Sequence, residues 1–401
     1  MPRRHAIPYT NSVCPPAIQT ATYYFNSTDE VISYHRGAAG FGRYGRYDNP
    51  GWIRVEQQLA KLEQAEDALI FPSGMSAITA TFLAHCKAGD RILFSGKGYR
   101  NVRNLCQDIL VKFGIDVVSI STADAEEFTA QIAAAYDARC KLIFLEVPSN
   151  PHLYLVDIKK IADFIADETV LVVDSTFATP INMLPLTLGA DLVVHSCGKY
   201  IGGHDDLLCG SVAGSKLLID AIRKVRNVTG SICDTASTAL LERSLKTLDM
   251  RMRALNANGY EIASWLDKHP MVARVYYPGL KSHPHNLLAI KQMRGFGGVV
   301  SFEIKADLQS ASSFVDRIQT AFMGTNFGGT LPLIEQVAVF TYFKEDHRAR
   351  EELGISDNLI RLSVGCDDPA ILLSDIDSAL SQINGSTSAS ATGKTKRSMA
   401  R

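Results

Sequence analysis

Two charged residues follow apolar, strand-like runs that lie close together in the sequence. Asp174 ends the run VLVVD (170–174), and Lys199 comes shortly after the run DLVVHS (191–196). A carboxylate at the end of a buried strand is costly unless it has a partner. If the two strands are neighbours, an acid and an amine lie at the same edge of a sheet, where they could hold a covalently bound cofactor.

Pyridoxal phosphate has these requirements, because it forms an imine with a lysine and needs an acid to keep its pyridine nitrogen protonated. It also needs a phosphate site and a flat side chain against its ring. Ser73 and Gly74 precede a predicted helix in FPSGMSAITA (71–80), and the free amides of a helix N-terminus bind anions. Tyr99 follows the run RILFS (91–95) and is placed to stack on the ring.

Each of these features has a more ordinary explanation when it is taken alone. An aspartate after a strand usually caps a helix or pairs with a cation. A lysine before two glycines usually lies in a solvated turn, and Ser-Gly before a helix is usually an N-cap. Their occurrence in this order on consecutive strands favours the cofactor site.

The elements that must position these residues are short apolar runs that alternate with amphipathic segments. The predicted strands are 67–71, 91–95, 141–147, 170–174 and 191–196, and the predicted helices include 75–87, 100–113, 124–136 and 157–166. This alternation is typical of a parallel sheet with crossover helices that is buried on both faces. Ligands bind at the carboxyl ends of such strands, where Asp174 and Lys199 are expected.

The sequence predicts two folded domains with an extension at each end. The predicted parts are an extended arm (1–50), a cofactor-binding domain (51–245), a smaller C-terminal α/β domain (246–383) and a disordered tail (384–401). Residues 238–266 are predicted to form one long helix, and 297–304 and 359–365 are predicted strands of the second domain. Small, polar and basic residues dominate the tail, which explains its predicted disorder.

The composition excludes several classes of protein. The 41 Lys and Arg residues nearly balance the 42 Asp and Glu residues, so no overall charge attracts nucleic acid or an anionic membrane. No apolar run is long enough to span a membrane, and the first residues lack the apolar core of a secretory signal. The eight cysteines show no CxxC spacing, which fits reduced thiols in a cytoplasmic protein without a cysteine-bound metal.

Longer motifs carry a resemblance to a known family. The motifs are YGRYDNPG (44–51), SGM (73–75), PSNP (148–151), VVDSTFATP (172–180), GADLVVHSCGKYIGGH (189–204) and GISDNLIRLSVGCDDP (354–369). From about residue 15 to 383, the chain resembles the Cys/Met-metabolism family of pyridoxal-phosphate enzymes, which includes cystathionine γ-synthase, cystathionine γ-lyase and methionine γ-lyase. The resemblance implies the aspartate-aminotransferase-like α/β fold (fold type I), with a large, mostly parallel sheet and a smaller C-terminal α/β domain.

The resemblance also implies roles for individual residues. Lys199 would form the aldimine with the cofactor and move protons, Asp174 would pair with the pyridine nitrogen, and Tyr99 would stack on the ring and act as an acid. The implied cofactor contacts further include Ser73, Gly74, Met75, Asn150, Thr176 and Ser196. Tyr44 and Arg46 would reach the phosphate of a neighbouring subunit, which implies a dimer with shared active sites and a homotetramer. Arg361 would bind the substrate α-carboxylate as a bidentate fork.

The chain departs from the family pattern at several of these places. Gly198 stands where the family has a phosphate-binding Ser or Thr before the lysine. Thr325 replaces a glutamate that meets the distal amino group in many cystathionine-handling members, and Asn326 replaces a serine near the substrate carboxylate. Residues 337–343 (VAVFTYF) replace a more polar stretch. The histidines of HPH (283–285) lie in a stretch that the family shares without metal, so we expect no metal site.

We therefore expect a lyase or transferase that catalyses γ- or β-elimination, or γ-replacement, on an L-amino acid through a vinylglycine-type intermediate. The missing distal acid favours a specialised reaction, such as propargylglycine synthesis from a γ-halo amino acid. One alternative is an ordinary cystathionine or methionine enzyme of sulfur metabolism. A second is a non-catalytic scaffold with the same fold, to which Gly198 gives slight support. An NAD-dependent dehydrogenase is poorly supported, because no GxGxxG follows the first strand.

Overall fold

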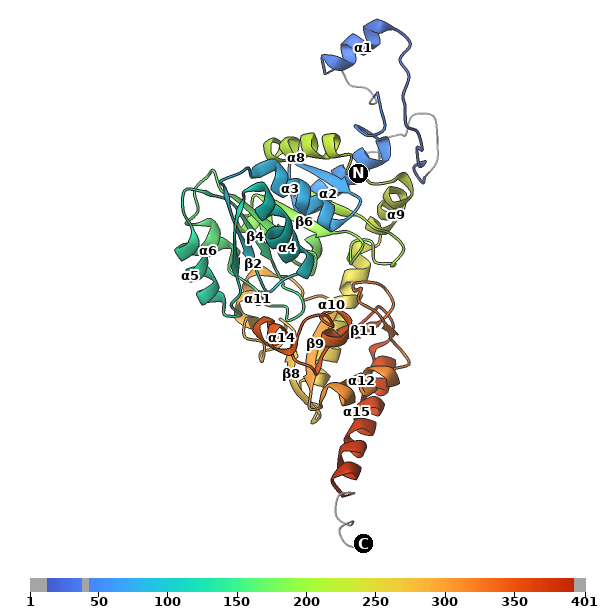
Figure 1. Cartoon of the computed structure of the whole chain (residues 1–401). Coiled ribbons are helices and arrows are strands. Elements are labelled where there is room, and N and C mark those ends of the chain that lie inside the picture. Colours follow the sequence, from blue (N-terminus) through green and yellow to red (C-terminus); the bar gives the residue numbers. More distant parts are fainter. Residues whose placement is uncertain (1–12, 38–42, 393–401) are drawn as a thin grey trace, which may run out of the picture.

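The computed structural model describes residues 13–37 and 43–392, with side chains described up to residue 383. Two sheets lie one after the other along the molecule, the first in the blue-to-green part of the chain and the second in the orange-to-red part (Figure 1). The helix α1 (Thr28–His35) projects beyond the first sheet, and α15 (Pro369–Thr392) extends at the opposite end. Among the described residues, no helix has the length and apolar character needed to cross a membrane.

The larger sheet has seven strands in the order β1-β7-β6-β5-β4-β2-β3. Its strands are β1 (Asp67–Phe71), β2 (Arg91–Ser95), β3 (Asp116–Ile120), β4 (Cys140–Glu146), β5 (Val170–Asp174), β6 (Leu192–Ser196) and β7 (Gly210–Gly214). Neighbours from β3 to β6 are parallel, while β7 is antiparallel to both β6 and β1. The carboxyl ends of β1, β4, β5 and β6 therefore meet at one edge, as the sequence predicts.

Helices cover both faces of this sheet and bury most of its strands, while the edge strand β3 is only partly buried. They are α2 (Pro50–Glu63), α3 (Gly74–His85), α4 (Arg100–Asn104), α5 (Ala125–Ala135), α6 (Ile158–Ala162), α7 (Thr179–Asn182), α8 (Lys216–Thr229) and α9 (Thr235–Leu245). Phe71, Phe94 and Phe144 are buried on one face with Phe82 of α3. Strands buried on both faces appear in the sequence as continuous apolar runs, which is why most of them could be predicted.

Two predicted helices are interrupted in the structure. The expected single helix over 238–266 is α9 followed by α10 (Leu248–Leu266), because the backbone leaves the helical conformation at Thr247 (φ −114°, ψ 4°). The expected helix over 100–113 is α4 followed by a π turn (Leu105–Ile109) and a 3₁₀ turn (Leu110–Phe113). Hydrophobic periodicity predicts which face of each segment is buried. It does not predict where a helix is interrupted or where it changes to a π or 3₁₀ turn.

Two strands of this sheet, β3 and β7, are not among the predicted ones, and β7 was missed because it is rich in glycine, which strand propensities disfavour. Its glycines have a packing reason. A Cβ on Gly210 would lie 2.2 Å from the Ser73 carbonyl oxygen, and one on Gly214 would lie 2.5 Å from the Asp191 carbonyl oxygen. Backbone approaches this close exclude every other residue type.

The smaller sheet has five strands in the order β10-β11-β12-β9-β8. The strands are β8 (Val272–Tyr276), β9 (Val299–Ile304), β10 (Phe322–Met323), β11 (Leu333–Gln336) and β12 (Leu359–Ser363). The helices that accompany α10 here are α11 (Asn286–Gln292), α12 (Leu308–Arg317), α13 (Val337–Phe340), α14 (His347–Leu353) and α15. In the central strand β12, Arg361 pairs with Glu335 of β11 on one side and with Ser301 of β9 on the other.

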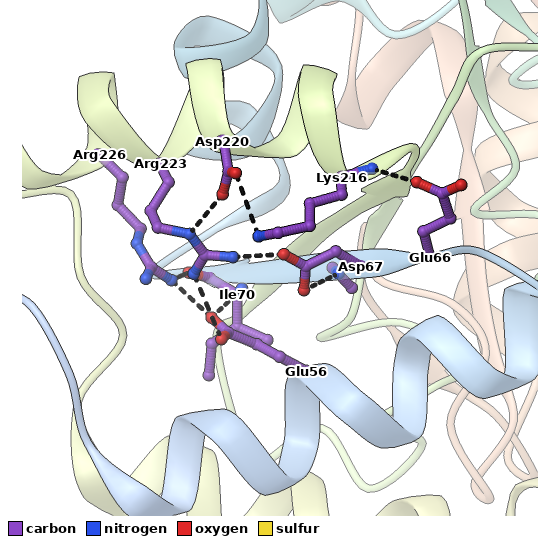
Figure 2. A network of polar contacts seen from close by, with 9 residues as sticks. Glu56, Glu66, Asp67, Ile70, Lys216, Asp220, Arg223 and Arg226 are labelled. Atoms are coloured by element: carbon purple, nitrogen blue, oxygen red, sulfur yellow. Dashed lines mark hydrogen bonds and ion pairs between the residues drawn. The ribbon is translucent and has the colours of Figure 1, made fainter. Parts of the chain in front are cut away.

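A buried polar network fixes α2 and α8 to the edge strand β1 (Figure 2). Arg226 of α8 donates to Glu56 Oε1 of α2 (2.6 Å) and to the carbonyl oxygen of Ile70 (3.1 Å). Glu56 also accepts from Ile70 N (3.1 Å), and Arg223 pairs with Asp67 (2.6 Å). The buried guanidinium and carboxylate are thus paired with each other, as such charges must be.

The structure describes parts of the two predicted extensions, the arm (1–50) and the tail (384–401). The described part of the arm contains α1 and a short bridge between Thr22 and Tyr44. The helix α15 continues to Thr392, past the start of the segment 384–401 that we predict to be disordered, and residues 393–401 lie outside the described part. The helix is apolar at Leu372, Ile376 and Leu380, which pack in the core.

Candidate active site

Asp174 lies at the carboxyl end of β5 and is buried. Its Oδ1 atom accepts hydrogen bonds from the backbone N (2.9 Å) and the Oγ1 hydroxyl (2.6 Å) of Thr176. The same hydroxyl accepts from Ser196 N (2.8 Å), so Thr176 joins the ends of β5 and β6. Burial raises the pKa of Asp174, and the Thr176 bonds oppose that rise. A positively charged ring nitrogen would supply the partner that this carboxylate needs.

Lys199 lies in the turn that follows β6, and its amine approaches the second sheet. Gly202 N donates to the Cys197 carbonyl (2.6 Å) and Gly203 N to the Lys199 carbonyl (2.7 Å), which fixes the turn. The amine donates to Asn326 Oδ1 and lies 5.2 Å from the centroid of the Phe327 ring. Burial, with a smaller contribution from the Arg361 guanidinium, lowers the pKa of Lys199 to about 8. A lysine with this pKa is partly neutral near neutral pH and can act as a nucleophile or a base.

The structure gives a reason for Gly198. A Cβ atom at this position would lie 2.8 Å from the Leu207 carbonyl oxygen, because the chain returns past Lys199 on its way to β7. Serine or threonine therefore does not fit here without a shift of the backbone. The missing hydroxyl is a consequence of the local path of the chain.

The start of α3 provides a site for an anion. Ser73 caps the helix, since its side chain accepts from Ser76 N (3.1 Å). A Cβ on Gly74 would lie 3.0 Å from the Cα and Cβ atoms of Ser196, so the helix start packs closely on the end of β6. The first amides of α3, including that of Met75, are at the same sheet edge as Asp174 and Lys199, where a phosphate can bind them.

Glu146 is a buried residue of this edge that sequence reasoning missed. It ends β4 directly beside Asp174 in the sheet. Its Oε2 atom accepts from Tyr99 N (2.6 Å) and its Oε1 atom from Asn150 N (2.7 Å). Burial, and then the nearby Asp174, raises the pKa of Glu146. The signal was present, because a glutamate at the end of KLIFLEV is as unusual as an aspartate at the end of VLVVD.

Arg361 connects the two sheets on the other side of the site. Its Nη1 atom donates to Asn150 Oδ1 (2.9 Å) and its Nη2 atom to the Thr325 carbonyl (2.6 Å). Glu335 forms an ion pair with it at 2.8 Å, and its guanidinium carbon lies 5.3 Å from the centroid of the Phe327 ring. These contacts hold the guanidinium in one orientation near Lys199, which suits the binding of a carboxylate.

Tyr99 lies at the mouth of the site, with 43% of its surface exposed. Its hydroxyl accepts from Asn101 Nδ2 (3.1 Å), and its backbone is fixed by Glu146. The next residue, Arg100, donates to the Thr341 carbonyl (2.8 Å) and so connects this loop to the smaller sheet. The exposed ring is free to stack against a ligand.

Tyr44 and Arg46 are apart from the other predicted site residues in the single chain. Arg46 donates to the Asn227 carbonyl at the end of α8, and its guanidinium carbon lies 5.7 Å from the ring centroid of Tyr44. The ring of Tyr44 is 43% exposed. The predicted contact of these residues with a neighbouring subunit stays a prediction.

Two other features of the chain, the HPH motif (283–285) and a hollow between two helices, were also candidates for functional sites. His283 and His285 are buried, and His285 Nδ1 accepts from Leu155 N (2.8 Å). In the described part of the chain, no group of three or more His, Cys, Asp or Glu side chains could hold a metal ion. A hollow of about 1050 Å³ lies between α10 and α15, lined in part by Trp265 and His269, but none of the predicted site residues borders it.

The arrangement fits pyridoxal phosphate on three observations of this structure. The buried carboxylate of Asp174 needs a cationic partner, the partly buried amine of Lys199 has a lowered pKa, and the helix start at Gly74 packs against the end of β6, the strand that leads to Lys199. Thr176 and Ser196 lie at the ends of β5 and β6, beside these groups, and Asn150 follows the neighbouring strand β4, so the three residues border the site of the ring and the phosphate.

Comparisons with known proteins agree with this chemistry. The family of Cys/Met metabolism PLP-dependent enzymes matches residues 3–381. Cystathionine gamma-synthase 1 of Arabidopsis thaliana is 40% identical over 93% of this chain and 66% of its own length. Cystathionine beta-lyase of Lactococcus lactis is 38% identical, over 92% of this chain and 94% of its own. A crystal structure of cystathionine gamma synthase from Xanthomonas oryzae in complex with cystathionine has a TM-score of 0.86 and 32% identity, covering 93% of this chain and 94% of that one.

Proposed function

The chain belongs to the family of Cys/Met metabolism PLP-dependent enzymes, and we propose that it catalyses γ-elimination or γ-replacement on an L-amino acid with a leaving group on its γ-carbon. It is an enzyme of the γ-lyase or γ-replacement type, and pyridoxal 5'-phosphate is its cofactor. The observation that carries the proposal is the position of the partly buried Lys199 amine, which follows the strand beside Asp174 and lies near the guanidinium of Arg361.

Each side chain has a stated task in this proposal. When bound, pyridoxal phosphate withdraws electrons from the substrate Cα and so makes its protons acidic. Lys199 Nζ then accepts the Cα proton, a task for which a pKa of about 8 suits an enzyme working near neutral pH. Arg361 binds the α-carboxylate through two parallel N–H groups. The hydroxyl of Tyr99 lies at the mouth of the site, where it can donate a proton to the leaving group.

The cofactor is held by residues of both chains of a proposed homodimer. Asp174 pairs with the pyridine nitrogen, while the start of α3 and Ser196 hold the phosphate. Tyr44 and Arg46 are proposed to reach the phosphate of the neighbouring subunit from the arm, and two such dimers would form a homotetramer. The proposed cofactor-binding domain (51–245) thus differs in task from the C-terminal domain (246–383), which supplies Arg361.

The substrate side favours a short, uncharged side chain. Thr325 carries no charge, and the nearest described carboxylates are already engaged: Glu335 with Arg361, and Asp205 with Asn326. Glu335 is therefore neutralised by Arg361, whereas Asp205 has only the neutral Asn326 amide as its partner, so the feature that disfavours a distal ammonium group is the absence of a glutamate at position 325. A specialised elimination, such as the formation of propargylglycine from a γ-halo amino acid, is one reaction of this kind. The relatives favour an ordinary reaction on cystathionine or methionine, which is the second candidate.

Turnover of a panel of amino acids tests the proposal. The purified holoenzyme is incubated with cystathionine, methionine, O-acetylhomoserine and a γ-chloro amino acid, and the products are identified by mass spectrometry. We expect the acetyl and chloro compounds to react faster than cystathionine. Rapid cystathionine turnover would show that the interpretation of Thr325 is wrong. Lys199→Ala is the control, and it should lose both turnover and the long-wavelength absorbance of the lysine-bound cofactor.

A further inference from the structure

Two loops from the two sheets meet above the amine of Lys199. One is the loop 199–206 after β6, and the other is the loop 324–330 before β11. The backbone joins them, since Thr330 N donates to the Gly203 carbonyl (3.1 Å). The carboxylate of Asp205 lies directly against Gly329, where a Cβ atom would be 2.1 Å from its Oδ2 atom. The absence of a side chain at Gly329 gives Asp205 its place at the mouth of the site.

A continuous chain of hydrogen bonds runs from the amine to this carboxylate. Lys199 Nζ donates to Asn326 Oδ1, and Asn326 Nδ2 donates to Asp205 Oδ1. The ammonium group is only a donor and the carboxylate only an acceptor. The amide between them satisfies both in one orientation alone, because the flipped amide would place two donors together at one end and two acceptors together at the other.

We propose that Asp205 is a positioning residue, which fixes the Asn326 amide so that its oxygen receives the Lys199 amine whenever that amine is not bonded to the cofactor. The inference rests on Lys199 being the reactive lysine of the proposed function. The site thereby holds the amine at a fixed acceptor instead of leaving the long lysine side chain to sample several rotamers. Asp205 takes up a left-handed backbone conformation (φ 56°), which aspartate tolerates better than most residues.

The other charges that face the amine do not replace Asp205. Arg361 opposes a positive charge on Lys199, and Glu335, which favours it, is already paired with Arg361. Asp205 is therefore the acid that supports the ammonium form from the side of the solvent. Its loss leaves the Asn326 amide free to turn and removes one source of stabilisation for the protonated amine.

Asp205→Ala is the first test, and Asp206→Ala is the matched control. Asp206 is the next residue on the same exposed loop, but its carboxylate pairs with Arg243 (3.0 Å) on the surface. We expect Asp205→Ala to lower kcat about tenfold, as the loss of a charge-assisted hydrogen bond does, with cofactor content unchanged. The control should keep the kcat of the unchanged enzyme. Equal kcat values for both variants would overturn the proposal.

A second measurement needs no turnover. In the cofactor-free full chain, Lys199 is acetylated over a range of pH, and the modified peptide is quantified by mass spectrometry. The Asp205→Ala amine should titrate at lower pH than the unchanged amine and react about threefold faster near neutral pH. The same titration in both proteins would contradict the assignment.

The orientation of the amide is tested by exchanging its partners. Asn326→Asp alone places two carboxylates together and should be at least as slow as Asp205→Ala. The double variant Asp205→Asn with Asn326→Asp reverses the second hydrogen bond, because the amide at 205 then donates to the carboxylate at 326, which still accepts from the Lys199 amine, and it should recover most of the lost kcat. No recovery would exclude the orienting role.

Borohydride reduction followed by peptide mapping separates this inference from the proposed function. If the cofactor is attached to a lysine other than Lys199, both ideas fail. If it is attached to Lys199 and Asp205→Ala is unchanged in kcat and in acetylation, the inference about Asp205 alone is wrong.

Discussion

At the scale of single residues, Glu146 determines the shape of the site without reaching the substrate. Its two oxygens receive the backbone amides of Tyr99 and Asn150, which belong to different loops. The same side chain therefore positions the Tyr99 ring, which we propose to stack on the cofactor, and the side-chain amide of Asn150, which contacts Arg361. A Cβ at Gly98 would lie 2.8 Å from Glu146 Oε2, so the first loop has to lie directly on this carboxylate.

Glu146→Gln keeps the shape of the side chain but has one acceptor oxygen instead of two. One backbone amide would then face an NH₂ group, and we expect a loss of about 1–3 kcal/mol in the free energy of unfolding, together with a lower kcat. Urea unfolding and steady-state kinetics measure both. The control is Glu66→Gln, because Glu66 also accepts a backbone amide, that of Lys216 (2.8 Å), but on the exposed surface. Equal effects from the two variants would rule out the buried role.

Residue chemistry was the most predictable part of the site. Asp174 and Lys199 could be found because charged residues at the ends of buried strands are rare without a purpose. The pairing of Asp205 with Asn326 could not be found, because the two residues are 121 positions apart on loops. Hydrophobic periodicity carries no information about which loops of two domains meet.

At the scale of elements, the close packing of α3 on β6 sets the position of the proposed phosphate site. Ser73 ends the connection from β1, and Gly74 starts the helix against Ser196. The antiparallel strand β7 completes this arrangement, because Gly210 lets its backbone pass beside Ser73. The helix start was predicted from the Ser-Gly pair, whereas β7 was not, since its glycines serve packing and weaken the strand signal.

Gly74→Ala tests this packing. Its Cβ would lie 3.0 Å from backbone and side-chain atoms of Ser196, so the helix start has to move, at a cost of about 1–3 kcal/mol. We expect weaker binding of pyridoxal phosphate, measured by equilibrium dialysis, and a lower urea midpoint. Gly324→Ala is the control, since the nearest atom to its Cβ is the end of the Leu333 side chain at 3.4 Å. Unchanged cofactor affinity in Gly74→Ala would argue against a phosphate at this helix.

At the scale of the whole molecule, buried aromatic and histidine side chains join the two sheets. His152 follows the loop of Asn150 and packs against Tyr276 of β8 at 4.8 Å between ring centroids. His283 lies beside it and is bonded to its carbonyl (3.3 Å). Burial lowers the pKa of His152 to about 4 and that of His283 to about 3. Both rings are therefore neutral in the folded protein at mildly acidic pH.

This contact predicts a loss of stability in acid. The unfolded chain binds protons on these histidines near pH 6.5, while the folded chain excludes them down to about pH 4 and about pH 3. The contribution of these neutral histidines to the free energy of unfolding is therefore complete above pH ~6.5. It decreases as the pH falls below this value. Urea midpoints at several pH values measure this slope. His283→Gln should flatten the slope, and His347→Gln, at an exposed position, should leave it unchanged.

The assignment of cofactor and substrate groups to different sheets has a consequence for engineering. Residues 324–343 include β11 and α13, and they contact the edge of the larger sheet at several points, among them Lys199 with Asn326, Gly203 with Thr330 and Arg100 with Thr341. A transplant of this segment between related enzymes therefore has to include its partners in the lysine turn, Gly203 and Asp205, while the proposed phosphate site at the start of α3 stays in place. New substrate preferences are then accessible by recombination of a short stretch together with these partners, without rebuilding the proposed phosphate site.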